Sequence, residues 1–202
     1  MLSRLNSYNS HLQELADLAI AAGATRAAVI STDEISTENR LAKLCRDPKC
    51  QNYGLSQSCP PHVSGPDGFK KYLKDKNHAI VVCIDLSTDI LFSEQRTEVM
   101  RLLHEIVSYV EKSAIEMGFA DSNGFAGSSC KKIFCGEYQN CNALSDTGQC
   151  RHPETARPSM SGYGINVSKL MTAAGWPSNM DSVTAKPGEK SMSWVAGLIV
   201  IG

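Results

Sequence analysis

The chain has 202 residues, of which 42% are hydrophobic and 20% charged, and its formal net charge is −1. This composition supports a buried core and excludes a disordered protein. The small net charge gives no general attraction to nucleic acid or to an anionic membrane surface, so neither is expected as a partner. No apolar stretch reaches the roughly 18 residues that span a bilayer, and the N-terminal residues lack a signal peptide's apolar region, so a cytoplasmic location is expected.

The first half of the chain alternates between helical and extended patterns. Leu12, Leu15 and Leu18 recur at helical spacing before Gly23, a natural helix stop. Apolar and β-branched runs indicate strands, and the longer of them predicts a strand buried on both faces. The expected elements are a helix over 9–22, a strand over 26–32, a helical turn over 38–44, a helix over 66–76 and a strand over 78–86.

The second half continues this alternation around a second irregular segment. A long helix is expected over 93–117, a strand over 119–127, a helix over 165–175 and a C-terminal strand over 193–202. Alternating strands and helices predict an α/β fold, with a mixed or parallel sheet of about four strands and flanking helices. Two long cysteine-rich loops interrupt the pattern, and a bound metal would staple such loops. Residues 1–202 are expected to form a single metal-binding domain.

Seven of the eight cysteines lie in these two loops. A reducing cytoplasm makes structural disulfides unfavourable, so metal binding or redox chemistry is the leading explanation. The eighth cysteine, Cys83, falls inside an apolar strand and is interpreted as a small buried hydrophobic residue. The first loop contains Cys45, Cys50 and Cys59, and the second contains Cys130, Cys135, Cys141 and Cys150.

Two kinds of metal centre suit these spacings. A single zinc ion would use the pairs Cys45-x4-Cys50 and Cys130-x4-Cys135, which leaves three cysteines without a role. A cubane iron–sulfur cluster commonly takes four thiolates and tolerates wider spacing. The sequence therefore favours two 4Fe–4S clusters, with zinc as the alternative. The second loop would supply all four ligands of one cluster.

The first loop supplies only three thiolates, so the fourth position of its cluster needs another ligand. Candidates are His62, Cys83, a small molecule, or a side chain from a redox partner protein. An open coordination position distinguishes a reactive metal site from a structural one. The cluster at Cys45, Cys50 and Cys59 is therefore the expected chemical centre, and the other cluster the expected electron relay.

Two stretches carry a resemblance to a known family: "CPPH" at 59–62 and "CRHPETARPSMSGYGINV" at 150–167. They resemble an uncharacterised family of predicted metal-binding proteins, which is cysteine-rich and found mainly in anaerobic bacteria and archaea. The most specific part is Arg157 to Met160 together with Gly164, Ile165 and Val167. The resemblance implies metal binding and an anaerobic setting, and it supplies no reaction.

Three functions follow from the pattern. The first is an iron–sulfur protein that acts in electron transfer or in small-molecule redox chemistry. The second is a zinc-stabilised binding module without catalytic activity, and the third is a thiol switch that senses oxidation. The sequence contains no nucleotide-binding, nucleophile-elbow or zinc-protease motif.

Overall fold

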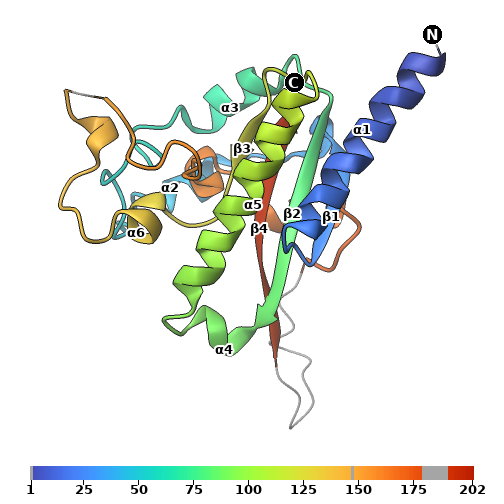
Figure 1. The fold of residues 1–202 in the computed structure, drawn as a ribbon. Coiled ribbons are helices and arrows are strands. Elements are labelled where there is room, and N and C mark those ends of the chain that lie inside the picture. Colours follow the sequence, from blue (N-terminus) through green and yellow to red (C-terminus); the bar gives the residue numbers. More distant parts are fainter. Residues whose placement is uncertain (1, 147, 179–190) are drawn as a thin grey trace.

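The computed structural model describes residues 2–146, 148–178 and 191–202, and a four-stranded sheet lies at its centre (Figure 1). The strands are β1 (Arg26–Ser31), β2 (His78–Ser87), β3 (Asn123–Phe125) and β4 (Met192–Ile201), arranged in the order β1-β2-β4-β3. Each pair of neighbours is antiparallel, and β2 and β4 pair along ten residues. These two strands form the middle of the sheet.

The prediction of a mixed or parallel sheet was wrong, although the four strands were predicted correctly. β2 and β3 do run in the same direction, as alternating strands and helices suggest, because both pair antiparallel with β4. The C-terminal strand β4 inserts between them, so no parallel pair forms. The alternation of elements indicated strand direction and could not indicate which strands become neighbours.

Helices α1 (Leu2–Ala21) and α5 (Arg96–Glu116) pack on one face of the sheet. Their apolar stripes meet alternate residues of β2, among them Ile80 and Val82, in one buried cluster. Leu103 and Val107 of α5 are fully buried in this cluster. In Figure 1 the two helices lie together in front of the strands.

The opposite face of the sheet is covered by α3 (Gly65–Leu73) and α7 (Val167–Ala173). Here the other set of β2 residues, Ala79, Val81 and Cys83, packs with Phe69 and Leu170. Both faces of β2 are therefore buried, which explains its unbroken apolar sequence. The helices and strands expected in both halves of the chain are confirmed to within a few residues at most boundaries, although α1 begins seven residues earlier than expected.

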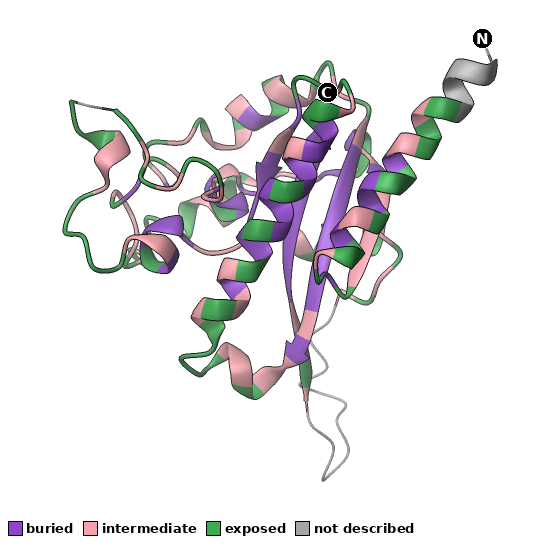
Figure 2. Cartoon of the chain, in the orientation of Figure 1, coloured by how far each residue is buried: buried purple, intermediate pink, exposed green. Residues whose placement is uncertain are grey.

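The two cysteine segments extend from one side of the sheet as a lobe of short elements and turns, on the left in Figure 1. The short helices of the lobe are α2 (Asn39–Lys43) and α6 (Cys130–Phe134), with 3-10 turns η2 (Asn142–Leu144) and η3 (Met160–Tyr163). Outside the lobe, α4 (Thr88–Leu91) follows β2 and the 3-10 turn η1 (Thr32–Glu34) follows β1. The sequence pattern did not indicate α4 or α6. Figure 2 shows that this lobe is mostly half-buried or exposed, whereas the central strands are buried.

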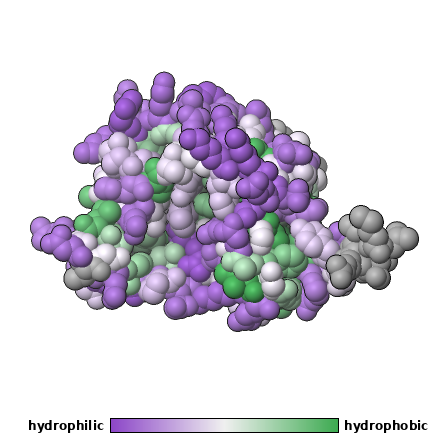
Figure 3. Space-filling view, turned by 90° about the horizontal axis from the view of Figure 1, so that it is seen from above, coloured by the Kyte–Doolittle hydropathy of each residue, from purple (hydrophilic) through white to green (hydrophobic). Residues whose placement is uncertain are grey.

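Within the described part of the chain, no helix is long and apolar enough to cross a membrane. The face seen from above in Figure 3 is mainly hydrophilic, with separate small hydrophobic patches.

Candidate metal centre

The first cysteine segment is a succession of tight turns that begins at the end of α2. The Cys45 amide donates to Ala42 O, and the Cys50 amide donates to Cys45 O at 3.0 Å. The Gly54 amide donates to Pro60 O at 2.8 Å and closes the segment on itself. These backbone bonds hold the three cysteines in one irregular stretch without a long regular element.

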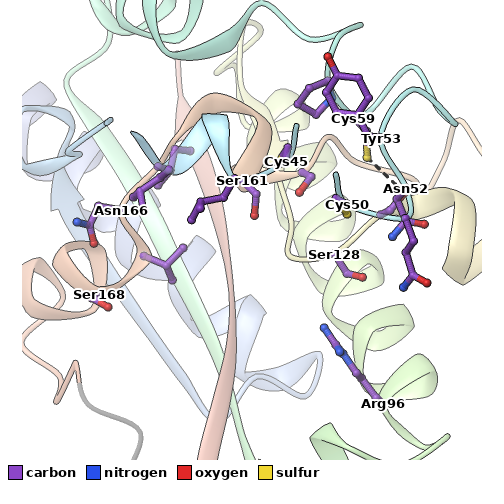
Figure 4. A pocket seen from close by; sticks show the side chains of 18 residues that line it. Cys45, Cys50, Asn52, Tyr53, Cys59, Arg96, Ser128, Ser161, Asn166 and Ser168 are labelled. Carbon is purple, nitrogen blue, oxygen red and sulfur yellow. Dashed lines mark hydrogen bonds between the residues drawn. The ribbon is translucent and has the colours of Figure 1, made fainter. Parts of the chain in front are cut away.

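Cys45, Cys50 and Cys59 line one pocket of about 520 Å³ (Figure 4). This volume lies within the roughly 300–1,000 Å³ that is usual for small-molecule sites. Hydroxyl and amide side chains contribute much of the wall, among them Asn52, Ser128 and Ser161. The structure thus brings the three predicted ligands of the first site to one cavity with room for a metal group and a further molecule.

Neither of the two fourth ligands proposed from within the chain lines this pocket. His62 faces a neighbouring cavity, which it shares with Cys130, Cys141 and Cys150. Cys83 is fully buried in β2, where Arg26 Nη2 donates to its sulfur at 3.3 Å. Among the described lining residues, the three cysteines are joined by no other Cys, His, Asp or Glu. In the structure, neither candidate lines the cavity of the first three cysteines.

The second segment folds around α6 and η2. Cys130 is the first residue of α6, Cys135 follows its end, and Cys141 precedes η2. The buried Lys131 side chain donates to Cys135 O at 2.6 Å and also to Tyr138 O. The ammonium group therefore satisfies two carbonyls just beyond a helix C-terminus, where a positive charge is favourable.

All four cysteines of this segment line a cavity of about 20 Å³. Cys130, Cys141 and Cys150 also line the adjoining cavity of about 430 Å³ that contains His62. The smaller space holds little more than one water molecule or ion, so a larger group would sit where the two cavities meet. The His152 amide donates to Cys150 Sγ at 3.3 Å, a contact that stabilises a thiolate.

Ser129 connects the two cysteine sets, because the Cys59 thiol donates to its hydroxyl at 3.3 Å and Cys130 is the next residue. Ser56, on the same loop as Cys59, is fully buried and lines the cavity of the second set. Its hydroxyl lies beside the Cys130 thiol, whose pKa it lowers, and forms no other hydrogen bond among the described residues. A hydroxyl beside a thiol favours the thiolate form, so Ser56 is placed to support metal binding by Cys130.

Burial keeps several of these thiols protonated when no metal is bound. It raises the pKa of Cys130 to about 11, and the nearby hydroxyl of Ser58 acts in the opposite direction. Burial, followed by the neighbouring Cys50 and Cys59, raises the pKa of Cys45. Burial, followed by Cys150, raises the pKa of Cys135. A bound cation reverses this preference, because thiolates are the metal ligands. Metal binding at these sites would therefore release protons.

Helix α5 holds the second segment in place through two buried side chains. His104 Nδ1 accepts from the Arg157 amide at 3.1 Å, and its Nε2 lies 3.2 Å from Gly127 O. Glu111, two turns further along, accepts from the Gly124 amide at 3.0 Å and pairs with the Arg157 guanidinium. His104 therefore has a structural role. Arg157 forms a buried salt bridge with Glu111.

Sequence reasoning did not single out Ser56, Arg96, Ser128, Ser129 or Lys131. Ser128 is the only non-glycine residue with a positive φ, 67°, among the described residues. Neither the hydroxyls nor Lys131 belongs to a recognisable ligand motif, and their positions follow from the fold. A single zinc ion bound by both Cys-x4-Cys pairs does not suit this arrangement, because Cys45 and Cys50 line a different cavity from Cys135.

All eight cysteines are free. Within the described residues, no group of three or more His, Cys, Asp or Glu side chains is close enough to hold a single metal ion. The fold and the grouped thiols define a cysteine-rich α/β protein. The model of the predicted metal-binding protein family DUF2284 matches residues 28–200, so the chain belongs to that family. No match was found among curated proteins or among solved structures.

Proposed function

We propose that this protein carries two iron–sulfur clusters and acts in electron transfer or small-molecule redox chemistry in a reducing cytoplasm. Cys130, Cys135, Cys141 and Cys150 would bind one cluster completely. Cys45, Cys50 and Cys59 would bind the other through three of its irons. Thiolate-bound clusters of this kind carry single electrons, at potentials set by cluster charge, hydrogen bonds to sulfur and exposure.

The observation that carries the proposal is the pocket of about 520 Å³ lined by three cysteines. Three thiolates facing a cavity of small-molecule size suit a cluster with one iron accessible to a further molecule. Its occupant would be a small-molecule ligand, or a group supplied by a redox partner protein.

The surrounding residues suit an electron path between the two sites. Cys59, Ser129 and Cys130 connect the sites through one hydrogen bond and one peptide unit. Near the second site, the His152 amide donates to Cys150 Sγ, and the Ser56 hydroxyl lies beside the Cys130 thiol. Donors of this type favour the more negatively charged, reduced form and raise the reduction potential.

A zinc-stabilised binding module is the second candidate. The cavity of about 20 Å³ among the four cysteines of the second segment favours it, because this space is of single-ion size. In that case the ion would hold the loop in place, and the first three cysteines would have no structural metal.

The test is the metal and acid-labile sulfide content of protein purified without oxygen. We expect about eight iron and eight sulfide per chain, and about half of each in Cys59→Ala. Cys83→Ala is the matched control, because Cys83 lies in the sheet beside Arg26, outside both cysteine sets, and its loss should leave the iron content unchanged. About one zinc, no sulfide and no effect of Cys59→Ala would instead support the binding module.

A further inference from the structure

The pocket at Cys45, Cys50 and Cys59 has a charged end formed by Arg96. Apart from the thiols, Arg96 is the only ionisable residue with a charge near neutral pH among the described residues that line it. No described residue forms a salt bridge or side-chain hydrogen bond with its guanidinium. In Figure 4, Arg96 extends from the start of α5 toward Ser128, with Asn52 beyond. This end of the pocket therefore presents an unpaired cation beside neutral polar groups.

The other end of the pocket combines apolar side chains with the polar Asn166 and Ser168. The apolar lining residues are Leu41 and Leu44 of the α2 region together with Ile165 and Val167. Leu44 is 57% exposed, which is high for a leucine at a cavity wall. Figure 4 places the neighbouring Asn166 and Ser168 at the side opposite Arg96, with Cys45 between. An occupant would therefore meet a cation at one end, thiols in the middle and apolar side chains at the other end.

We infer that this pocket binds a small monocarboxylate with a short apolar chain. A guanidinium forms two parallel hydrogen bonds with a carboxylate, and here one positive charge is available for one negative charge. A phosphate dianion would leave its second negative charge without a positive partner among the described lining residues. The apolar chain would cover Leu44 and contact Val167, which removes apolar surface from water. The monocarboxylate would be the external ligand at the open iron of the proposed function. Only its part in redox chemistry rests on that function, and its binding to the pocket does not.

The test is calorimetric titration with acetate, butyrate and hexanoate, because it reports binding without needing any activity. We expect affinity to rise several-fold with each two methylene groups, and hexanol to bind much more weakly than hexanoate. Arg96→Gln should weaken hexanoate about tenfold to hundredfold, and Arg96→Lys, which keeps the charge without the planar donor pair, should fall between. Arg46→Gln is the matched control, because exposed Arg46 adjoins Cys45 and lies outside the pocket lining.

Several outcomes would overturn the inference. These are no measurable binding by any of the three acids, equal binding by hexanol, equal loss in Arg46→Gln, or hexanoate binding unchanged in folded Arg96→Gln. Tighter binding of butyl phosphate than of hexanoate would also overturn it and would indicate a phosphate site.

The iron and sulfide content of the same samples separates this inference from the proposed function. If protein without iron binds hexanoate and the binding depends on Arg96, the carboxylate pocket is supported and the iron–sulfur proposal is rejected. If the protein has full iron and sulfide content but hexanoate binding does not depend on Arg96, the iron–sulfur proposal is supported and the carboxylate pocket is rejected. In iron-containing samples, hexanoate should also change the electron paramagnetic resonance signal of the reduced protein, and it should not do so in Arg96→Gln.

Discussion

His104 is fully buried on α5, and both of its ring nitrogens contact backbone groups of the cysteine lobe. Because Nδ1 accepts from the Arg157 amide, Nε2 carries the proton and donates to Gly127 O. This arrangement requires the neutral ring. Burial accordingly lowers the pKa of His104 from 6.5 to about 4. One side chain thus connects the helix to both ends of the second cysteine segment only while it is uncharged.

This depressed pKa predicts a specific dependence of stability on pH. Above about pH 6.5 the folded and unfolded chains are both neutral at His104, so it adds no pH dependence. As the pH falls from 6.5 to 4, the unfolded chain takes up a proton that the folded chain does not. The free energy of unfolding should therefore fall by about 3 kcal/mol over that window and then level off. Urea unfolding of the wild type and of His104→Gln at pH 7, 6 and 5 measures this change.

The expected difference between the two proteins lies in the slope. His104→Gln should be less stable at pH 7 by about 1–3 kcal/mol, because it disturbs buried hydrogen bonds. Its stability should then fall less steeply toward pH 5, since the titrating group is gone. Other groups that titrate, the cysteines included, are common to both chains and cancel. Parallel pH profiles would show that His104 is not the neutral buried group described here.

At the scale of elements, η3 attaches the start of the first cysteine segment to the rest of the fold. The Glu38 amide, which precedes α2, donates to Gly164 O at 2.8 Å. Gly164 has a φ of 66°, and a Cβ there would lie 2.5 Å from Glu38 O. Gly164 therefore permits a close approach of the two backbone segments. It sets the position of α2, and α2 leads directly to Cys45.

Gly164→Ala should therefore be strongly destabilising, by about 2–4 kcal/mol, because it adds a clash with backbone to an unfavourable φ. Gly175→Ala is the control, since Gly175 has a φ of 75° but nothing within 4 Å of a Cβ. That control should cost only about 1–2 kcal/mol, from backbone strain alone. Thermal unfolding of both variants gives the difference. Equal losses would mean that the close approach to Glu38 adds nothing.

Elements with a clear period could be predicted from the sequence, and the pairing of those elements could not. The helix around Leu15 and the strand β2 could be predicted because the pattern of apolar residues along each segment indicates which of its side chains are buried. The place of β4 between β2 and β3 depends on contacts between distant segments. In the candidate site, the grouping of cysteines followed from their spacing. Ser129, Ser56 and Arg96 reach it only through folding, so no local pattern indicates them.

At the scale of the whole molecule, the sheet and the cysteine lobe differ in what stabilises them. Two apolar clusters, one on each face of the sheet, contain most of the buried hydrophobic residues. Cys83 belongs to one of them, and the seven lobe cysteines belong to neither. The lobe depends instead on turns, on Lys131 and on the anchors from α5. The sheet thus has a stabilising core of its own, whereas the lobe lacks one.

Metal removal should therefore loosen the lobe and leave the sheet folded. Under the proposed function, metal removal takes from residues 45–62 and 130–150 the group that would connect their thiols, so local opening becomes less costly there. The ten-residue ladder between β2 and β4 keeps its burial on both faces. Hydrogen exchange of loaded and chelator-treated protein under reducing conditions should show much faster exchange in the two segments and little change in these strands. The amides of α1, which packs far from the lobe against β1 and α5, provide an internal control for global unfolding. Equal acceleration in β2, β4 and the cysteine segments would mean that the fold opens as one unit and that the thiol-bound group stabilises all of it.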